Sequence, residues 1–278
     1  MRISSLQITT KISNKLSWNY KYLLRAHGNT IYHCCIQKSG SRWFKKVFSD
    51  KIIWQQNKLL LHDPSNNFIT EDQIILQKLN KLPNDLIISP LYIRYPEFDT
   101  LQKPDAHKTF FIARDPRDLI ISNYFSLKYS HDPYHPYILK MREKLNSMSQ
   151  DDGITNIINS FTAGTKKTLD GWFKQKSKKI KLIKFEEIFG EKQYNVFSRL
   201  LKHCNINIST TDIKFLLEKY SFKNISGRKQ GSEDIKHHYR KGISGDWKNH
   251  FTNQHKDLFK KLSGSLLVIC GYEKDNNW

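Results

Sequence analysis

Short apolar runs alternate along the chain with longer stretches of helical periodicity. Buried strands are predicted at four apolar, β-branched runs: Thr30–Ile36, Asp85–Tyr95, Lys108–Ala113 and Lys181–Phe185. The second of these is predicted to break at Pro90, because proline cannot donate to a neighbouring strand. Apolar spacing of three and four predicts helices from about Trp43 and at Glu71–Leu82, Tyr194–Cys204, Thr211–Tyr220 and Gln254–Leu262.

Polar segments separate these elements. Residues 62–71 carry Pro, Ser and Asn and are predicted to form a loop. The region of about 223–245 is rich in Gly, Lys, Arg and His, which is typical of a mobile basic loop. A short apolar stretch, Leu266–Cys270, ends the chain's predicted elements.

A strand followed by a polar turn and a helix occurs twice, near residues 36–43 and near residues 113–118. In the second case Asp115 is a good N-cap, Pro116 suits the first helical position, and Asp118 is placed to close a capping box. This alternation favours right-handed crossovers between parallel strands. We therefore expect one α/β domain over residues 1–278, with a central parallel sheet flanked by helices.

The composition is consistent with such a domain and indicates where in the cell the protein is expected. The chain has 278 residues, of which 38% are hydrophobic and 13% aromatic, enough for a sizeable core. No signal peptide is recognised, and no apolar run approaches the roughly 18 residues of a membrane span, so a cytoplasmic protein is expected. The four cysteines form no CxxC pair, which favours buried thiols over zinc or disulfides.

Charge points to an anionic partner. With 46 Lys and Arg against 26 Asp and Glu, the formal net charge is +20. Nucleic acid, a membrane surface and a multiply charged nucleotide all fit this excess. A Lys-, Asn- and Ile-rich sequence is also typical of an AT-rich genome, which reduces the weight of the charge as a functional signal.

The turn after the first strand, QKSGSRW at residues 37–43, is suited to an anion. Helix N-termini present unpaired N–H groups, Gly40 lets the main chain come close, and Lys38 adds a full charge. Ser39 and Ser41 add hydroxyl donors. The Lys precedes the Gly, so the turn resembles a P-loop without matching the Walker A pattern. An ordinary β-turn with an exposed lysine is the alternative.

Two further segments carry charge at predicted turns. ARDPRD, residues 113–118, places Arg114 at a strand end with Ser122 eight residues later. An acidic residue at a strand end also resembles a Walker B motif, and Arg117 with Asp118 is compatible with a simple ion pair. In YRKGISGDWKNHFT, residues 239–252, Arg240, Lys241 and Gly242 form a compact receptor for a doubly charged phosphate.

The three segments, in this order, resemble the sulfotransferase family that uses 3′-phosphoadenosine 5′-phosphosulfate (PAPS), and most closely its bacterial and cyanobacterial branch. QKSGSRW is similar to the family's PKSGTTW, Arg114 to Ser122 to its RxPRD motif with a later Ser, and residues 240–249 to its RKGxxGDWKN. The resemblance covers about residues 31–252. It implies an α/β fold, sulfuryl transfer, and 3′-phosphoadenosine 5′-phosphate (PAP) as product, without a metal.

The resemblance also implies roles for individual residues. Lys38, Ser39, Gly40 and Ser41 would hold the 5′-phosphosulfate, with Lys38 stabilising the departing oxygen. The implied receptor for the 3′-phosphate consists of Arg114, Ser122, Arg240, Lys241 and Gly242. Trp43 and Phe222 would stack on the adenine, and Phe185 replaces a Tyr that many relatives carry. Taken singly, Trp43 and Phe222 fit a core position equally well.

The sequence departs from the family at several positions. Cytosolic animal relatives carry KTH on the second strand with His as general base, where this chain has SPLYIRY. Four residues remain as candidates for that base: Tyr92, Glu97, His131 and His33. Arg42 replaces a Thr and adds a cation that either binds phosphate or faces solvent. KNHFTNQHKD, residues 248–257, is a degenerate form of the family's dimer motif, so a homodimer is compatible with the sequence but in doubt.

The expected function is sulfuryl transfer from PAPS to a hydroxyl or nitrogen of a small-molecule acceptor. A secondary metabolite fits, with a saxitoxin-type alkaloid as a minor suggestion. An aromatic acceptor pocket is predicted from Tyr124, Phe125, Tyr129, Tyr134, Tyr137 and Trp172, although Phe125 and Trp172 fit the core equally well. The alternatives are a basic nucleic-acid-binding protein, which the motifs make less favourable, and a PAP-binding protein without catalysis.

Overall fold

A computed structural model describes residues 29–64, 84–133 and 135–278. The predicted helix at Glu71–Leu82 lies outside these residues, as does most of the predicted loop at 62–71. Tyr134, predicted to line an acceptor pocket, also lies outside them.

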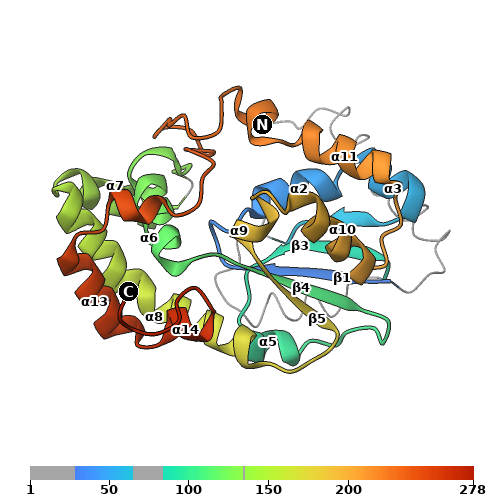
Figure 1. The fold of residues 1–278 in the computed structure, drawn as a ribbon, viewed down its shortest axis with the longest axis horizontal. Coiled ribbons are helices and arrows are strands. Elements are labelled where there is room, and N and C mark those ends of the chain that lie inside the picture. The colour runs from blue at the N-terminus through green and yellow to red at the C-terminus, as the bar shows by residue number, and fades with distance from the viewer. Residues whose placement is uncertain (1–28, 65–83, 134) are drawn as a thin grey trace, which may run out of the picture.

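Five parallel strands form the central sheet, in the order β2-β3-β1-β4-β5 (Figure 1). Their bounds are β1 Ile31–Cys35, β2 Leu60–His62, β3 Leu86–Leu91, β4 Lys108–Ala113 and β5 Ile180–Lys184. Every neighbouring pair runs parallel, and β1 lies in the middle, paired with both β3 and β4. The prediction of a single α/β domain with a central parallel sheet is confirmed.

Alternating residues of the central strands supply two separate cores. In β1, Ile31 and Cys35 face one core, whereas Tyr32 and Cys34 face the other. Because both faces are covered, these strands are continuous apolar runs rather than alternating polar and apolar ones. This explains why the apolar runs of the sequence located β1, β4 and β5 to within one residue, although β2 was not predicted and β3 ends before the predicted Tyr95.

Helices cover both faces of the sheet, and Figure 1 shows α2 and α10 on one side of it and α5 on the other. The first core contains residues of α2 (Ser41–Phe48), α3 (Lys51–Asn57), α10 (Gln193–His203) and α11 (Thr210–Lys219). The second contains residues of α5 (Tyr95–Asp99), α8 (Gln150–Lys174) and α14 (Leu266–Ile269). The short α9 (Phe185–Ile188) follows β5 directly.

A third, helical core lies beside the sheet. It joins α8 to α6 (Pro116–Phe125), the π-helical η2 (Ser126–Ser130), α7 (Pro136–Asn146) and α13 (Asn253–Ser263). Two short elements lie near the site described below: α12 (Phe222–Ser226) and the 3₁₀ turn η3 (Asp246–Asn249). The segment between them is irregular, as predicted, and crosses between the two halves of the ribbon in Figure 1.

Several local predictions were wrong. β3 continues through Pro90 and ends at Leu91, because the chain then turns into α5 rather than extending to Tyr95. Leu266–Cys270 is mostly the short helix α14. No element was predicted for α7 and α8, although the buried residues of α8 recur every three or four positions. Small and polar residues on its buried face, including Gly153, Thr162 and Thr165, weaken that pattern.

The cysteine prediction is confirmed: Cys34, Cys35, Cys204 and Cys270 are all buried and free of disulfides. Within the described ranges, no helix is long and apolar enough to cross a membrane.

Trp172 belongs to the core under the sheet and not to a ligand pocket. It is fully buried, stacks on Phe111 with ring centroids 4.6 Å apart, and donates from Nε1 to the carbonyl of Ile93 at 2.9 Å. Its prediction as an acceptor contact was wrong, because its helix face points to the sheet.

We therefore expect Trp172→Ala to lower the free energy of unfolding by about 3–5 kcal/mol, through lost packing and a residual cavity. Urea unfolding followed by circular dichroism measures it. Leu139→Ala is the control, because Leu139 is 47% exposed on α7 and its truncation should stay within about 0.5 kcal/mol. Equal losses in the two variants would contradict the assignment of Trp172 to the core.

Candidate functional site

The carboxyl edge of the sheet carries a cavity of about 830 Å³. Lys38 follows β1 and Arg114 follows β4, and because these strands are parallel neighbours, the two residues emerge side by side. Arg114 Nη1 donates to the main-chain carbonyl of Lys38 at 2.9 Å. The first two sequence motifs are thus joined directly.

The turn before α2 has an unusual main chain. Lys38 adopts φ 71° and Gly40 φ 86°, both in the left-handed region, where a lysine is uncommon. A Cβ on Gly40 would lie 2.8 Å from the ring of Phe189, so the position also needs glycine for space. By helix geometry, the first N–H groups of α2 have no partner within the helix and are available to a ligand.

The two serines of this turn differ. Ser41 lines the cavity, and its hydroxyl lies 2.8 Å from the hydroxyl of Tyr92. Ser39 is fully buried behind the turn, where its hydroxyl donates to the carbonyl of Ile36. Its predicted part as a hydroxyl donor to a ligand is therefore not supported by its position, because that hydroxyl already has an internal acceptor.

Lys38 is the most perturbed amine of the cavity. Its Nζ donates to the hydroxyl of Ser126 at 2.9 Å. Desolvation, followed by the charges of Arg114, Arg42 and Arg240, lowers the pKa of Lys38 to about 7. Because this amine loses its proton near neutral pH, a bound anion would stabilise its charged form.

Arg114 is only partly satisfied by the protein. Its guanidinium lies 4.4 Å from the ring centroid of Phe185 and 4.0 Å from the carboxylate of Asp118. Its buried Nε has no hydrogen-bond partner in the part of the chain that the structure describes. Ser122, predicted beside it, lines the same cavity.

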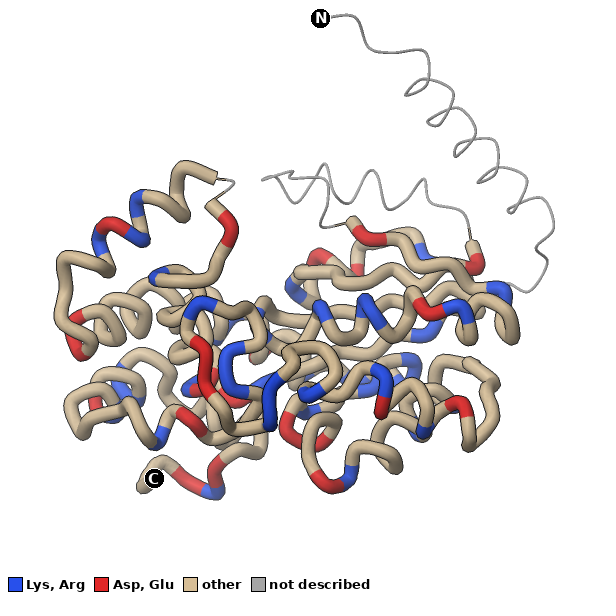
Figure 2. Tube along the Cα trace, turned by 90° about the horizontal axis from the view of Figure 1, so that it is seen from above, with Lys and Arg blue, Asp and Glu red and all other residues tan. Residues whose placement is uncertain are grey.

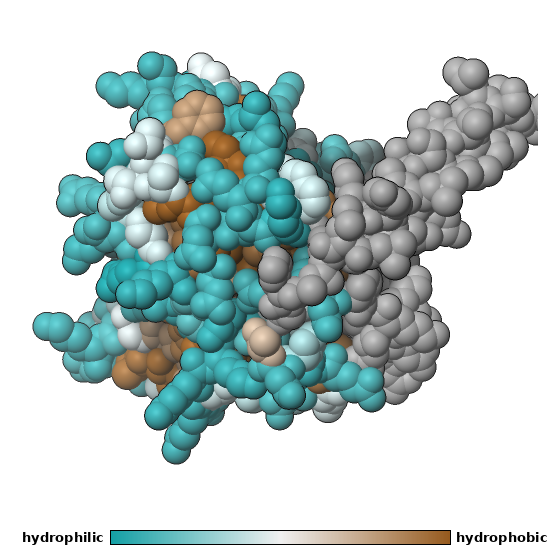
Figure 3. Space-filling model, turned by 90° about the vertical axis from the view of Figure 1, so that its right-hand side faces the viewer, coloured by the Kyte–Doolittle hydropathy of each residue, from teal (hydrophilic) through white to brown (hydrophobic). Residues whose placement is uncertain are grey.

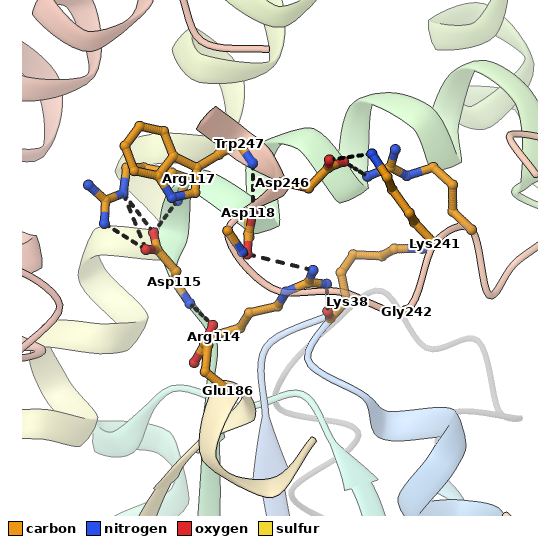
Figure 4. Close-up of polar contacts among 12 residues, drawn as sticks. Lys38, Arg114, Asp115, Arg117, Asp118, Glu186, Lys241, Gly242, Asp246 and Trp247 are labelled. Carbon is orange, nitrogen blue, oxygen red and sulfur yellow. Dashed lines mark hydrogen bonds and ion pairs between the residues drawn. The ribbon is translucent and has the colours of Figure 1, made fainter. Parts of the chain in front are cut away.

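Asp118 joins the second motif to the third. Its carboxylate accepts hydrogen bonds from the N–H groups of Gly245, at 2.6 Å, and Trp247, at 2.9 Å (Figure 4). The predicted capping box was therefore wrong: the N–H of Asp115 donates to Glu186 instead, at 2.9 Å. Asp115 itself caps α6 as predicted, by accepting from the N–H of Arg117 at 2.9 Å.

Arg117 has a structural environment. It pairs with Asp115 at 2.7 Å and with Glu273 at 2.5 Å, and its guanidinium lies between the rings of Trp247 and Trp278. The suggested ion pair of Arg117 with Asp118 is not formed, since Asp118 points to the main chain of η3.

The third motif is arranged around Asp246. This buried carboxylate pairs with Arg240 and with Lys241, the latter at 2.7 Å, and also contacts Asn249 and His250 (Figure 4). Desolvation raises the pKa of Asp246, but hydrogen bonds from His250, Lys241, Arg240 and Asn249 outweigh it and hold the pKa well below its usual range.

Gly242 is required by space as well as conformation. It adopts φ 71°, and a Cβ there would lie 2.3 Å from the ring of Phe222. The Phe222 ring therefore lies against the main chain of the third motif, and both line the cavity. Trp43 also lines it but is 4% exposed, with its Nε1 donating to the carbonyl of Tyr220.

The four base candidates occupy different places. His33 is fully buried, hydrogen-bonded to Ser89 and stacked on Phe110, so it does not reach the cavity. Glu97 pairs with Arg94 on α5 and also lies away from it. These two predictions were wrong, because both side chains are committed elsewhere.

Tyr92 and His131 do line the cavity. Desolvation is the main cause that raises the pKa of Tyr92, so its phenol is a proton donor near neutral pH. His131 Nδ1 lies 3.2 Å from the carbonyl of Asp132. Arg42 of α2 also lines the cavity, and its guanidinium lies 3.9 Å from the Asp132 carboxylate.

The predicted aromatic acceptor pocket was wrong for the described residues. Tyr124 and Phe125 are buried in the helical core, Tyr129 lies beside Phe125, and Tyr137 is 52% exposed. None of them lines the cavity. Its aromatic wall comes instead from Phe185, Phe189, Tyr220 and Tyr239, besides Trp43, Tyr92 and Phe222. Sequence reasoning missed Phe189, Tyr220 and His238, which belong to no motif, and it assigned no role to Tyr239 at the start of the third segment.

Comparisons with known proteins agree with this arrangement. The sequence matches the family model described as the sulfotransferase domain over residues 31–271. The chain belongs to the sulfotransferase family. A flavonol sulfotransferase-like protein of Flaveria bidentis is 24% identical and aligns over 88% of this chain and 85% of its own. Cytosolic sulfotransferase 3 of Arabidopsis thaliana is also 24% identical, over 84% of this chain and 75% of its own.

Solved structures share the fold. Mouse sulfotransferase SULT7A1, complexed with PAP, superposes with a TM-score of 0.62 at 18% identity, over 91% of this chain and 92% of its own. Retinol dehydratase, in complex with androsterone and PAP, gives a TM-score of 0.51 at 13% identity, over 89% and 83% of the two chains. In the described part of this sulfotransferase, no three His, Cys, Asp or Glu residues are grouped to hold a metal ion.

The link between the second and third motifs is testable through Asp118. We expect Asp118→Asn to lower the free energy of unfolding by about 1–3 kcal/mol, because one acceptor oxygen is lost opposite a buried N–H group. Chemical unfolding measures it, with Asp257→Asn on the exposed face of α13 as control. If the two variants lose equal stability, Asp118 does not hold the third motif in place.

Proposed function

We propose that this sulfotransferase moves a sulfuryl group from PAPS to a hydroxyl or nitrogen of a small-molecule acceptor and releases PAP. The observation that supports it is the meeting of Lys38, Arg114, Arg240 and Lys241 at one cavity, although they come from three distant segments. The cavity is large enough for a nucleotide together with a small acceptor.

Three features of the cavity fit an anionic nucleotide. The buried Nε of Arg114 has no partner among the described residues. Gly40 and Gly242 bring main chain to the wall at places where a Cβ would collide with an aromatic ring. Among the described residues that line the cavity, six are Lys or Arg and Asp132 is the one acid.

We assign each of these groups to a part of the donor according to its position in the cavity. Lys38, Ser41, Arg42 and the first N–H groups of α2 would bind the 5′-phosphosulfate. The 3′-phosphate would be bound by Arg114, Ser122, Arg240, Lys241 and the main chain at Gly242. Phe222 and the exposed edge of Trp43 would flank the adenine. Ser39 supports the turn from behind rather than touching the donor.

In this arrangement Lys38 stabilises charge where it develops. Sulfuryl transfer leaves negative charge on the oxygen that departs with the 5′-phosphate, and a fixed cation there lowers the barrier. The Lys38 amine is held by Ser126 and pointed into the cavity beside the other cations. Aromatic and apolar walls around it exclude water and strengthen this interaction.

The alternatives are less well supported. A nucleic-acid surface requires a continuous basic face, whereas Lys and Arg are spread along the trace with Asp and Glu between them (Figure 2). The face in Figure 3 is mostly hydrophilic, with small separate apolar patches. Loss of catalysis with retained PAP binding would require a disabled Lys38, but its side chain lies in the cavity.

The acceptor is proposed to be a small molecule without net positive charge. Six cationic side chains against one acid disfavour a cationic alkaloid of the saxitoxin type. A secondary metabolite with a phenol or alcohol fits the aromatic wall. A cytoplasmic location is inferred by analogy with the relative from Arabidopsis thaliana, which is named cytosolic. Homodimerisation through residues 248–257 stays a prediction.

Donor binding is tested first by thermal unfolding with PAP. At about 100 times its Kd, PAP should stabilise the fold by about 2.7 kcal/mol, and ATP should give much less. Arg240→Ala should weaken PAP about tenfold and affect adenosine 5′-phosphosulfate less, because only PAP has the 3′-phosphate.

Arg199→Ala, an exposed arginine of α10 away from the cavity, is the matched control and should leave both affinities unchanged. Equal stabilisation by PAP and ATP that disappears with salt would favour the nucleic-acid alternative.

Lys38 gives PAP binding a defined pH dependence. Because the pKa of Lys38 is lowered to about 7, a bound phosphate that favours the charged amine takes up a proton above that pH. PAP affinity should therefore fall as pH rises from 7, by up to about tenfold per unit. His131 and His238 have lowered pKa values and contribute at lower pH. Isothermal titration between about pH 6 and 9 measures this dependence.

Two variants of Lys38 separate charge from shape. Lys38→Arg stays charged throughout and should flatten the pH dependence. Lys38→Met should bind PAP with the weaker affinity that the unchanged protein shows at high pH, and should lower kcat at saturating PAPS by at least about 10²-fold. Full turnover in Lys38→Met would refute the role given to this residue.

A further inference from the structure

His238 lies on the wall of the cavity but outside the sequence motifs. It comes two residues before Arg240 in the irregular segment between α12 and η3, and it lines the same cavity as Lys38. The side chain is half-buried. Among residues 29–64, 84–133 and 135–278, no hydrogen bond to either ring nitrogen is formed, so neither nitrogen is committed to a protein group.

The main chain around His238 is held firmly. Arg228 donates to the carbonyls of Tyr239 and Arg240, the latter at 2.9 Å from Nη1. His237 accepts from the N–H of Tyr239 at 3.1 Å through its Nδ1. The same hydrogen bonds that hold the main chain at Arg240 therefore also hold the main chain next to His238, beside the proposed 3′-phosphate site.

Burial and, after it, the surrounding charges keep His238 neutral in the free protein. Desolvation, followed by the charges of Lys38, Arg42, His131 and His237, lowers the pKa of His238 to about 2. These groups come from the turn before α2, from α2, from the end of η2 and from the histidine's own segment. A bound polyanion would offset the cations, so the basicity of His238 would rise when the donor is present.

The other candidate bases are less suited. The phenol of Tyr92 is protonated and hydrogen-bonded to Ser41. His131 directs Nδ1 toward the adjacent carbonyl of Asp132, 3.2 Å away, at the more exposed end of the cavity. His238 instead adjoins Tyr239, with ring centroids 5.5 Å apart, in a segment fixed by Arg228.

We propose that His238 is the general base that accepts the proton of the acceptor in sulfuryl transfer. This inference rests on the proposed function. The acceptor oxygen bonds to sulfur, the bond from sulfur to the 5′-phosphate oxygen breaks with its electron pair on PAP, and the acceptor proton passes to a His238 ring nitrogen. The imidazolium then releases that proton to water, which restores the neutral ring.

Histidine NMR tests the inference without any acceptor. Proteins labelled at histidine are titrated over about pH 4–9 with and without PAP, and signals are assigned with His238→Gln and His131→Gln. The His238 ring should stay neutral over this whole range in the free protein, and it should titrate within the range when PAP is bound. An unchanged His238 ring with saturating PAP would overturn the proposal.

The same titration distinguishes a failure of the proposed function from a failure of the base assignment alone. PAP binding is followed independently by calorimetry in the same samples. No PAP binding would overturn the proposed function itself, whereas PAP binding that shifts His131 and leaves His238 unchanged would overturn the assignment of the base alone.

Kinetics with two phenols of similar size gives a second readout. 4-Nitrophenol ionises near neutral pH by itself, whereas 4-methoxyphenol needs a base. His238→Gln should lower kcat/KM for 4-methoxyphenol by about 10²-fold and spare 4-nitrophenol, with PAP affinity kept. His131→Gln should leave the ratio of the two phenols unchanged. Equal loss with both phenols in His238→Gln would indicate a structural role and refute the proposal.

Discussion

Repulsion among cations gathered at the carboxyl edge of the sheet is the constraint on which the rest of the site depends. Lys38 and Arg114 leave neighbouring strands and lie side by side, and Arg240 and Lys241 reach the same cavity from a distant segment. The pKa of Lys38 is lowered to about 7 by burial and by the arginines, which shows the cost of this crowding. Cations packed this closely keep their positions only if carboxylates compensate part of their charge from the side away from the cavity.

Two aspartates supply that compensation, and each also fixes main chain. Asp246 accepts from Arg240 and Lys241, so these cations are held in the free protein and need not be ordered by a ligand. Asp118 lies near Arg114 and accepts from the N–H groups of Gly245 and Trp247. The carboxylates therefore position the cations, and Arg240 pairs with Glu233 as well as with Asp246.

This arrangement connects donor binding with chemistry. Burial is the main reason that His238 is neutral in the free protein, and the positive groups that add to this effect are the ones that a polyanionic donor would neutralise. In the proposed mechanism the base thus gains its strength only when the donor is in place. Such coupling needs no movement of the segment around His238, because the hydrogen bonds from Arg228 already hold it.

The sequence by itself determined the parallel α/β class, the strands β1, β4 and β5 to within one residue, and the three motif segments that line the cavity. Strands buried on both faces must be apolar throughout, and turns that approach an anion require Gly40 and Gly242, so these features are local. Tertiary structure alone decided which side chains face the cavity. Ser39 turns inward, Trp172 packs under the sheet, His33 is buried, and His238 enters from a segment without a motif. The direction of a side chain depends on contacts between elements far apart in the chain, and no local sequence pattern predicts these contacts.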